Sequence, residues 1–266
     1  MLEPAQRASA ADRLWTAEQE RAPIEPLTDT YPGIDVVDAY EIQLLNVRRR
    51  LSSGARIVGH KVGLSSPVMQ QMMGVDEPDY GHLLDSMVLS QQAPIPVDRY
   101  CYPRIEVEIA YVLGASLPGE GCTEEDVLAA TEYVVPSVEL IDSRIVDWRI
   151  RLADTIADNA SSAGVILGDE RQRLAGRRVA GRDVADIDVV LYAGDQEVAR
   201  GNTSAVLGDP TTAVAWLARK VAGFGVTLEA GHVILPGSCT RAVDVHPGET
   251  YRVEFTGLGT VTARFE

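Results

Sequence analysis

Residues 104–113 read Arg-Ile-Glu-Val-Glu-Ile-Ala-Tyr-Val-Leu, an apolar and β-branched run with two glutamates inside it. This composition predicts a buried β-strand. Successive side chains of a strand point to opposite faces, so Glu106 and Glu108 share one face, roughly 6–7 Å apart along the backbone. Two interpretations are open. The strand lies at an edge with its acidic face in water, or the two carboxylates hold a hard divalent cation.

A second apolar run, residues 133–142, contains one glutamate, Glu139. On a neighbouring strand, this third carboxylate would complete a face of three oxygen ligands and leave positions open for water or substrate. Such an arrangement suits a catalytic Mg²⁺ or Mn²⁺. The second run therefore favours the metal site over the exposed edge.

Composition restricts the class of protein. The chain has 266 residues, 45% of them hydrophobic, and a net charge of −15, which argues against binding to nucleic acid or to an anionic membrane surface. A small acidic substrate is not excluded, because a local metal or lysine can override the global charge. No apolar run reaches membrane-spanning length, and the N-terminus does not resemble a signal peptide. Three scattered cysteines without CxxC spacing predict a reducing cytoplasm.

The order of the predicted elements indicates an α+β fold with a mainly β core. We expect an N-terminal helical cap over residues 1–55 and a β-rich catalytic domain over residues 56–266. Within the latter, the patterns predict a Met-rich helix at 68–73, a turn-rich loop at 74–89 and a helix at 210–221.

Two further segments carry chemically interesting side chains. Lys61 lies in the apolar strand predicted over 57–64, where it is either an exposed cation or a functional one. In the loop, Asp79 and His82 are either acid–base groups or surface and capping residues. The small polar side chains of residues 154–164 suit either a lined pocket or a capping loop.

Several motifs together resemble one known family. They are Glu106-Val107-Glu108 with Glu139, Gly59-His60-Lys61-Val62-Gly63, Pro78-Asp79-Tyr80-Gly81, Asp158-Asn159-Ala160-Ser161 and Leu235-Pro236-Gly237-Ser238. The chain is similar over its whole length to the fumarylacetoacetate hydrolase superfamily. Within it, the motifs resemble the branch of 2-hydroxypentadienoate hydratases and 4-oxalocrotonate decarboxylases of meta-cleavage pathways, most of all the hydratases of actinobacterial steroid and aromatic degradation.

The resemblance implies a fold and a site. The fold would be a mixed β-roll or β-sandwich core with an N-terminal helical cap, in a homo-oligomer. The metal, Mg²⁺ or Mn²⁺, would be held by Glu106, Glu108 and Glu139. Lys61 and Asp79 would be the acid–base residues. Substrate would be bound by Asn159, Ser161 and Ser238.

The implied reaction is the addition of water to 2-hydroxypenta-2,4-dienoate, or to its hexadienoate homologue, giving a 4-hydroxy-2-oxo acid. The same site would serve a decarboxylase of 2-oxohex-3-enedioate, whose second carboxylate needs a cation such as Arg104, Arg144 or Arg241. A degenerate, non-catalytic binding subunit is a third interpretation, which the complete set of glutamates argues against. Association with a downstream aldolase or a sister decarboxylase is also implied.

Overall fold

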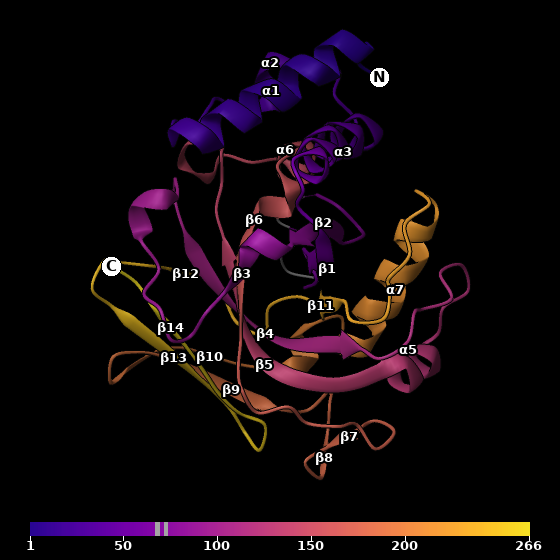
Figure 1. Ribbon diagram of the computed structural model, residues 1–266, viewed down its shortest axis with the longest axis vertical. Helices are drawn as coiled ribbons and strands as arrows, with labels where there is room; N and C mark the ends of the chain where they lie inside the picture. The colour runs from indigo at the N-terminus through magenta and orange to yellow at the C-terminus, as the bar shows by residue number, and fades with distance from the viewer. Residues whose placement is uncertain (67–69, 72–73) are drawn as a thin grey trace.

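Two β-sheets form the body of the protein, and helices cover them at the top and on one side (Figure 1). The computed structural model describes residues 1–66, 70–71 and 74–266. Within these residues there is an eight-stranded mixed sheet, a four-stranded antiparallel sheet and a two-stranded ribbon. The predicted α+β class with a mainly β core is confirmed.

The helices are α1 (Pro4–Glu20), α2 (Leu27–Thr30), α3 (Val36–Ser52), α5 (Glu124–Ala130), α6 (Leu152–Ala157) and α7 (Pro210–Ala222). The strands are β1 (Ile57–Gly63), β2 (Asp79–Leu84), β3 (Val88–Leu89), β4 (Arg104–Leu113), β5 (Thr131–Ile141), β6 (Ser162–Leu167), β7 (Arg178–Val179), β8 (Arg182–Asp183), β9 (Asp188–Ala193), β10 (Gln196–Asn202), β11 (Val233–Leu235), β12 (Val243–Asp244), β13 (Thr250–Phe255) and β14 (Gly259–Arg264).

The large sheet has the strand order β2-β1-β11-β4-β5-β6-β3, with β12 pairing to β4. Strands β4 and β5 are its longest pair and run antiparallel, whereas β11 runs parallel to β1. The four-stranded sheet has the order β10-β9-β13-β14. Strands β4 and β5 alternate as a buried pair should, so their side chains reach both faces of the large sheet.

The N-terminal helices lie together at one end of the molecule, where α3 packs on α1 and α6 (Figure 1). Asp38 on α3 is fully buried and accepts hydrogen bonds from the N–H of Leu2 and from Nε of Arg7, both at 2.8 Å. Apolar residues of this cap belong to the same buried cluster as residues of both sheets. The division into domains at residues 55 and 56 stays a prediction.

Two sequence expectations need correction. The segment 74–89 is not a loop throughout, because Asp79–Leu84 forms β2, which pairs antiparallel with β1. Its proline, glycine and acidic residues resemble a turn, but the pairing with β1 outweighs that local preference. The segment 154–164 is neither all pocket lining nor all loop, since it ends α6, turns and begins β6. The predicted Met-rich helix lies mostly outside the described residues.

No helix among the described residues is long and apolar enough to cross a membrane.

Candidate active site

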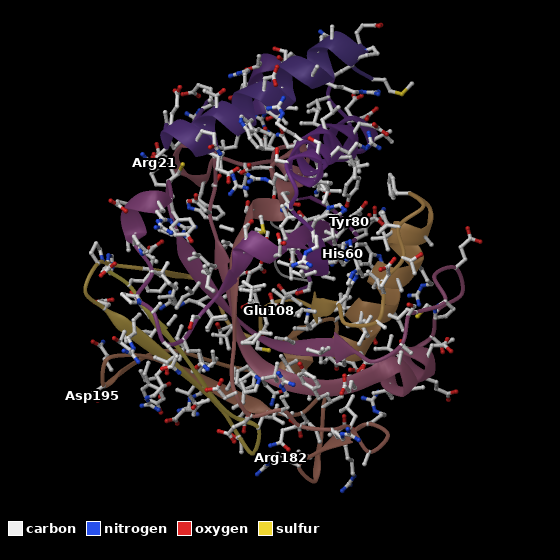
Figure 2. All side chains as sticks on the ribbon, viewed as in Figure 1. Arg21, His60, Tyr80, Glu108, Arg182 and Asp195 are labelled. Atoms are coloured by element: carbon white, nitrogen blue, oxygen red, sulfur yellow. The ribbon has the colours of Figure 1, made fainter. Side chains whose placement is uncertain are left out.

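Three glutamate side chains meet where β4 and β5 pair. Glu106 lies directly opposite Glu139 in the antiparallel register, and Glu108 lies opposite Ser137. One carboxylate oxygen from each glutamate lies within 4.8 Å of the other two. Glu108 and Glu139 are fully buried, and Figure 2 shows Glu108 near the centre of the molecule. The structure therefore brings together the carboxylates that strand alternation places on one face.

These carboxylates have more hydrogen-bonding capacity than the described residues use. Oε1 of Glu108 and both oxygens of Glu139 are buried without a hydrogen-bond partner there. Oε2 of Glu108 accepts from the N–H of Gly237 at 2.7 Å, and Nζ of Lys61 lies 3.4 Å from Oε2 of Glu139. Buried oxygens without partners are costly unless a donor or a cation satisfies them. The donor set fits a hard divalent cation such as Mg²⁺ or Mn²⁺.

The pKa values of the three glutamates reflect the same excess of negative charge. Burial raises the pKa of Glu106. Burial, followed by repulsion from Glu139 and Glu106, raises the pKa of Glu108 well above its ordinary value. Burial raises the pKa of Glu139 to about 7, although Lys61 and the Ser162 hydroxyl act in the opposite direction. A bound cation would relieve this repulsion.

Lys61 and Asp79 reach the site from the adjacent strands β1 and β2. Their side chains are only 3% and 1% exposed, so the interpretation of Lys61 as a solvated surface cation is wrong. Burial alone lowers the pKa of Lys61, but the charge of Glu139 and the other nearby carboxylates raises it above its ordinary value. Burial raises the pKa of Asp79. The site therefore combines four acidic groups with one ammonium.

Gly63 shows how closely these two side chains approach the backbone. A Cβ atom on Gly63 would lie 2.1 Å from Oδ1 of Asp79 and 3.4 Å from Nζ of Lys61. Oδ2 of Asp79 accepts a long hydrogen bond of 3.4 Å from the Thr155 hydroxyl, whereas its Oδ1 has no partner among the described residues. The acid and the ammonium thus converge on one glycine.

The three residues that the resemblance assigns to substrate binding differ from one another in whether their side chains already have hydrogen-bond partners. The Asn159 amide is engaged with the backbone of His82, accepting at 2.8 Å and donating at 2.9 Å. Oγ of Ser238 accepts from the N–H of Val107 at 3.1 Å. Oγ of Ser161 is buried without a partner among the described residues. Ser161 therefore has a hydroxyl to offer, while Asn159 and Ser238 already hold backbone groups.

Sequence reasoning did not single out three contributors. The N–H of Gly237 binds Glu108, the carbonyl of Ala160 accepts from Nζ of Lys61 at 2.9 Å, and the Ser162 hydroxyl lowers the pKa of Glu139. The first two lie inside quoted motifs, but backbone groups leave no side-chain signal. Ser162 follows Ser161 in the polar run.

The three arginines considered for a second carboxylate are engaged elsewhere. Nε of Arg104 donates to Asp244 at 2.6 Å, and Nε of Arg144 donates to Asp158 at 2.6 Å. Arg241 is exposed and donates to a backbone carbonyl at 2.8 Å. In the described structure, each guanidinium is committed to a partner outside the glutamate cluster.

Comparisons with known proteins agree with this geometry. The family model "Fumarylacetoacetate (FAA) hydrolase C-terminal" matches residues 59–266. The chain is 43% identical over 265 residues to a 2-keto-4-pentenoate hydratase of Paraburkholderia xenovorans (strain LB400), covering 100% of this chain and 97% of the relative. It is 42% identical to a 2-oxo-hept-4-ene-1,7-dioate hydratase of Escherichia coli, covering 96% of both chains.

A solved structure is similar over the whole chain. It is a 4-oxalocrotonate decarboxylase from Pseudomonas putida G7 complexed with magnesium and adipate, with a TM-score of 0.93, 37% sequence identity and coverage of 100% of this chain and 99% of that one.

Proposed function

The chain belongs to the fumarylacetoacetate hydrolase family, and from that premise we propose that it is a divalent-metal-dependent hydratase of the 2-keto-4-pentenoate type. It adds water to 2-hydroxypenta-2,4-dienoate or 2-hydroxyhexa-2,4-dienoate and releases a 4-hydroxy-2-oxo acid. The observation that carries this proposal is the cluster of half-buried Glu106 with buried Glu108 and Glu139, and with Lys61 beside it. Meta-cleavage catabolism of aromatic compounds is the metabolic setting, and a role in steroid degradation stays a prediction.

The metal would be held by Glu106, Glu108 and Glu139, and the unpartnered oxygens of Glu108 and Glu139 fit a hard cation. When bound, Mg²⁺ or Mn²⁺ supplies Lewis-acid polarisation of the substrate's 2-oxygen. Magnesium is supported by the solved structure at 37% identity, which contains this ion.

The reaction needs several proton transfers in addition to the attack of water. A proton leaves the 2-hydroxyl and another arrives at C5, after which hydroxide adds at C4 and a proton at C3. Lys61 carries a proton at Nζ, and Asp79 presents Oδ1 without a competing partner among the described residues. We assign these transfers to the pair, each worth typically about 10²–10⁴-fold in rate. Ser161 would bind the substrate through its hydroxyl, whereas Asn159 and Ser238 would shape the pocket through the backbone they hold.

The hydratase is favoured over the decarboxylase because the arginines considered for a second substrate carboxylate are already paired with other groups. A diacid substrate would need a free cation for its second carboxylate, but Arg144 is buried against Asp158 and Arg104 is paired with Asp244. The relative that is 43% identical is also a hydratase by name, and its named substrate has a single carboxylate.

Two assays on metal-reconstituted enzyme test the proposal. Enzymatically generated 2-hydroxypenta-2,4-dienoate is followed by loss of its ultraviolet absorbance, and 2-oxohex-3-enedioate by release of CO₂. We expect rapid loss of the dienoate with formation of 4-hydroxy-2-oxopentanoate, and no CO₂. Release of CO₂ from the diacid with slow dienoate turnover would assign the chain to the decarboxylases. Full activity after exhaustive chelation would refute the metal role.

The lysines offer a matched pair of variants, because the chain contains only Lys61 and Lys220. Lys220 is on α7 and pairs with Glu77 at 2.7 Å. We expect K61M and D79N to lower kcat by at least about 10²-fold and K220M to leave it unchanged. Normal turnover by K61M would remove Lys61 from the mechanism.

We also propose a cytoplasmic homo-oligomer, and light scattering on the purified protein tests the oligomeric state. The free thiols of Cys101, Cys122 and Cys239 support a reducing compartment. Association with a downstream aldolase or a sister decarboxylase stays a prediction from the resemblance.

A further inference from the structure

The turn between α6 and β6 has a backbone conformation that is rare outside glycine. Asn159, Ala160 and Ser161 have φ angles of 55°, 49° and 57°, so three successive residues lie in the left-handed region. Asparagine tolerates this region comparatively well, but alanine has no polar side chain to offset the strain. Such conformations persist only where surrounding contacts enforce them, and they concentrate at functional sites.

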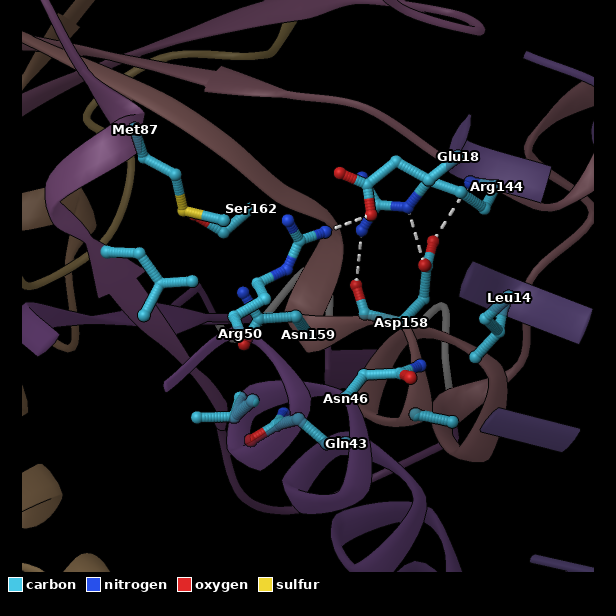
Figure 3. A pocket seen from close by; sticks show the side chains of 13 residues that line it. Leu14, Glu18, Gln43, Asn46, Arg50, Met87, Arg144, Asp158, Asn159 and Ser162 are labelled. Carbon is cyan, nitrogen blue, oxygen red and sulfur yellow. Dashed lines mark hydrogen bonds and ion pairs between the residues drawn. The ribbon is translucent and has the colours of Figure 1, made fainter. Parts of the chain in front are cut away.

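Buried hydrogen bonds fix both ends of the turn. At the start of the turn, the Asp158 carboxylate accepts two hydrogen bonds from Arg144, one from Nε at 2.6 Å and one from the backbone N–H at 2.9 Å. The backbone carbonyl of Asp158 accepts a third from Nη2 of Arg144 at 2.6 Å. Figure 3 shows this pair in the wall of a pocket that Asn159 also lines. At its end, the Ser161 carbonyl accepts from the N–H of Asp142 at 2.8 Å.

Asn159 ties the turn to β2. Its side-chain amide pairs with both backbone groups of His82, as the peptide group of an adjacent strand would. The backbone carbonyl oxygen of Asn159 packs against Gly81, where an added Cβ atom would lie only 2.4 Å from it. Because β2 is the first strand of the large sheet and β6 begins at Ser162, Asn159 joins two strands that are far apart in the sheet order.

Between these anchors, the Ala160 carbonyl accepts a hydrogen bond from Nζ of Lys61 at 2.9 Å, and the same ammonium lies 3.4 Å from Glu139. A lysine side chain is flexible and its ammonium can settle against any nearby oxygen. We propose that the Asn159–Ser161 turn is a positioning element, whose strained backbone directs the ammonium of Lys61 toward the glutamate cluster through the Ala160 carbonyl. The catalytic consequence rests on the proposed function.

The variant A160G tests this directly. Glycine adopts a positive φ without strain but leaves the turn free to move. We expect kcat to fall about 10–100-fold with KM nearly unchanged, as for a misplaced catalytic group. The thermal midpoint should stay equal or rise, because strain has been removed. Lower turnover at equal or greater stability is not the signature of a residue that only supports the fold.

A second readout is independent of turnover. Since the chain has two lysines, protein labelled with ¹³C,¹⁵N-lysine gives two sets of side-chain signals. In A160G, the Lys61 signals should shift and broaden, while those of Lys220 stay in place. The spectra are recorded below the thermal transition, so a change in stability does not obscure them.

Ala180 provides the matched control. It has a φ of 48° and lies between β7 and β8, away from the turn. A180G relieves the same backbone strain, and we expect it to leave both kcat and the Lys61 signals unchanged.

N159G supplies a second variant, since it keeps a residue suited to positive φ but removes both bonds to His82. The His82 amide should exchange with solvent faster, and the Lys61 signals should move as in A160G. Unchanged Lys61 signals or unchanged kcat in A160G would overturn the proposal. If the wild-type protein turns over neither substrate, the proposed function fails, whereas the lysine spectra still decide whether the turn positions Lys61.

Discussion

Gly63 is a single residue on which the geometry of the proposed acid–base pair, Lys61 and Asp79, depends. A methyl group there would overlap Oδ1 of Asp79 at 2.1 Å and lie in van der Waals contact with Nζ of Lys61 at 3.4 Å. We expect G63A to lower kcat by about 10²-fold, because small displacements of a catalytic group are costly. G33A is the control, since Gly33 is exposed and its added Cβ would meet nothing within 4 Å. Equal kinetics of G63A and wild type would contradict the assigned geometry.

Glu139 allows metal binding to be separated from folding. E139Q removes one buried charge and one strong oxygen ligand, so we expect the affinity for Mg²⁺ to fall by at least about tenfold. The metal-free protein should be as stable as wild type or more so, because the cluster buries more carboxylates than the single ammonium of Lys61 can compensate. Calorimetric titration and urea unfolding measure the two effects. E132Q, an exposed position on the same strand, should change neither.

At the scale of single residues, the sequence predicts which face of a strand a side chain occupies better than it predicts what surrounds that side chain. Strand periodicity alone places Glu106 and Glu108 on one face, and the register with β5 adds Glu139. The sequence does not reveal that Lys61 is buried, because a lysine on an apolar strand is usually solvated. Nor does it reveal that the Asn159 amide is consumed by backbone, since that contact joins segments 77 residues apart.

At the scale of elements, the long central strands were predictable and the edge strand was not. Residues 104–113 form β4 with the expected bounds, because a continuous apolar run admits few alternatives. Strand β2 resembles a loop in sequence because it follows Pro78 and contains Gly81. The structure explains this glycine by the close approach of the Asn159 carbonyl. Tertiary contacts here override local propensity.

A buried carboxylate on α3, Asp38, joins this helix to α1. Asp38 is fully buried, and its Oδ1 lies 2.7 Å from Nη2 of Arg7. We expect D38A to lower the free energy of unfolding by about 3 kcal/mol, because it leaves a partly buried guanidinium unpaired. The control is D12A, which removes the exposed ion pair between Asp12 and Arg49 on the same two helices and should cost under about 1 kcal/mol. Urea unfolding compares them, and equal losses would contradict the prediction.

At the scale of the whole molecule, two buried histidines make stability depend on pH. His60 and His82 lie with ring centroids 4.9 Å apart. Burial lowers the pKa of His82 to about 4 and that of His60 well below its ordinary value. Both are neutral in the folded protein, whereas the unfolded chain takes up protons below about pH 6.5. Their contribution to stability is therefore present above that pH and is lost on acidification.

The size of this effect can be measured. Each histidine should remove up to about 1.4 kcal/mol of unfolding free energy per pH unit between pH 6.5 and its folded pKa. Urea unfolding of H82Q at several pH values should show a shallower loss on acidification than wild type. H246N, at an exposed position, should keep the wild-type slope. An identical slope in H82Q would show that His82 is not the origin.

Strand β11 has only three residues, Val233–Leu235, yet it separates β1 from β4 in the large sheet. Lys61, Glu106 and Glu108 all precede residue 110 in the sequence. The strands that carry them, β1 and β4, reach their final positions only when β11, more than a hundred residues further along the chain, inserts between them. Strands β4 and β5 can pair and bring the three glutamates together before β11 is synthesised, but Lys61 on β1 can join them only afterwards. Because long-range insertion slows folding and leaves strand edges unpaired meanwhile, we expect the junction of Lys61 with the glutamates to be among the last parts of the molecule to form.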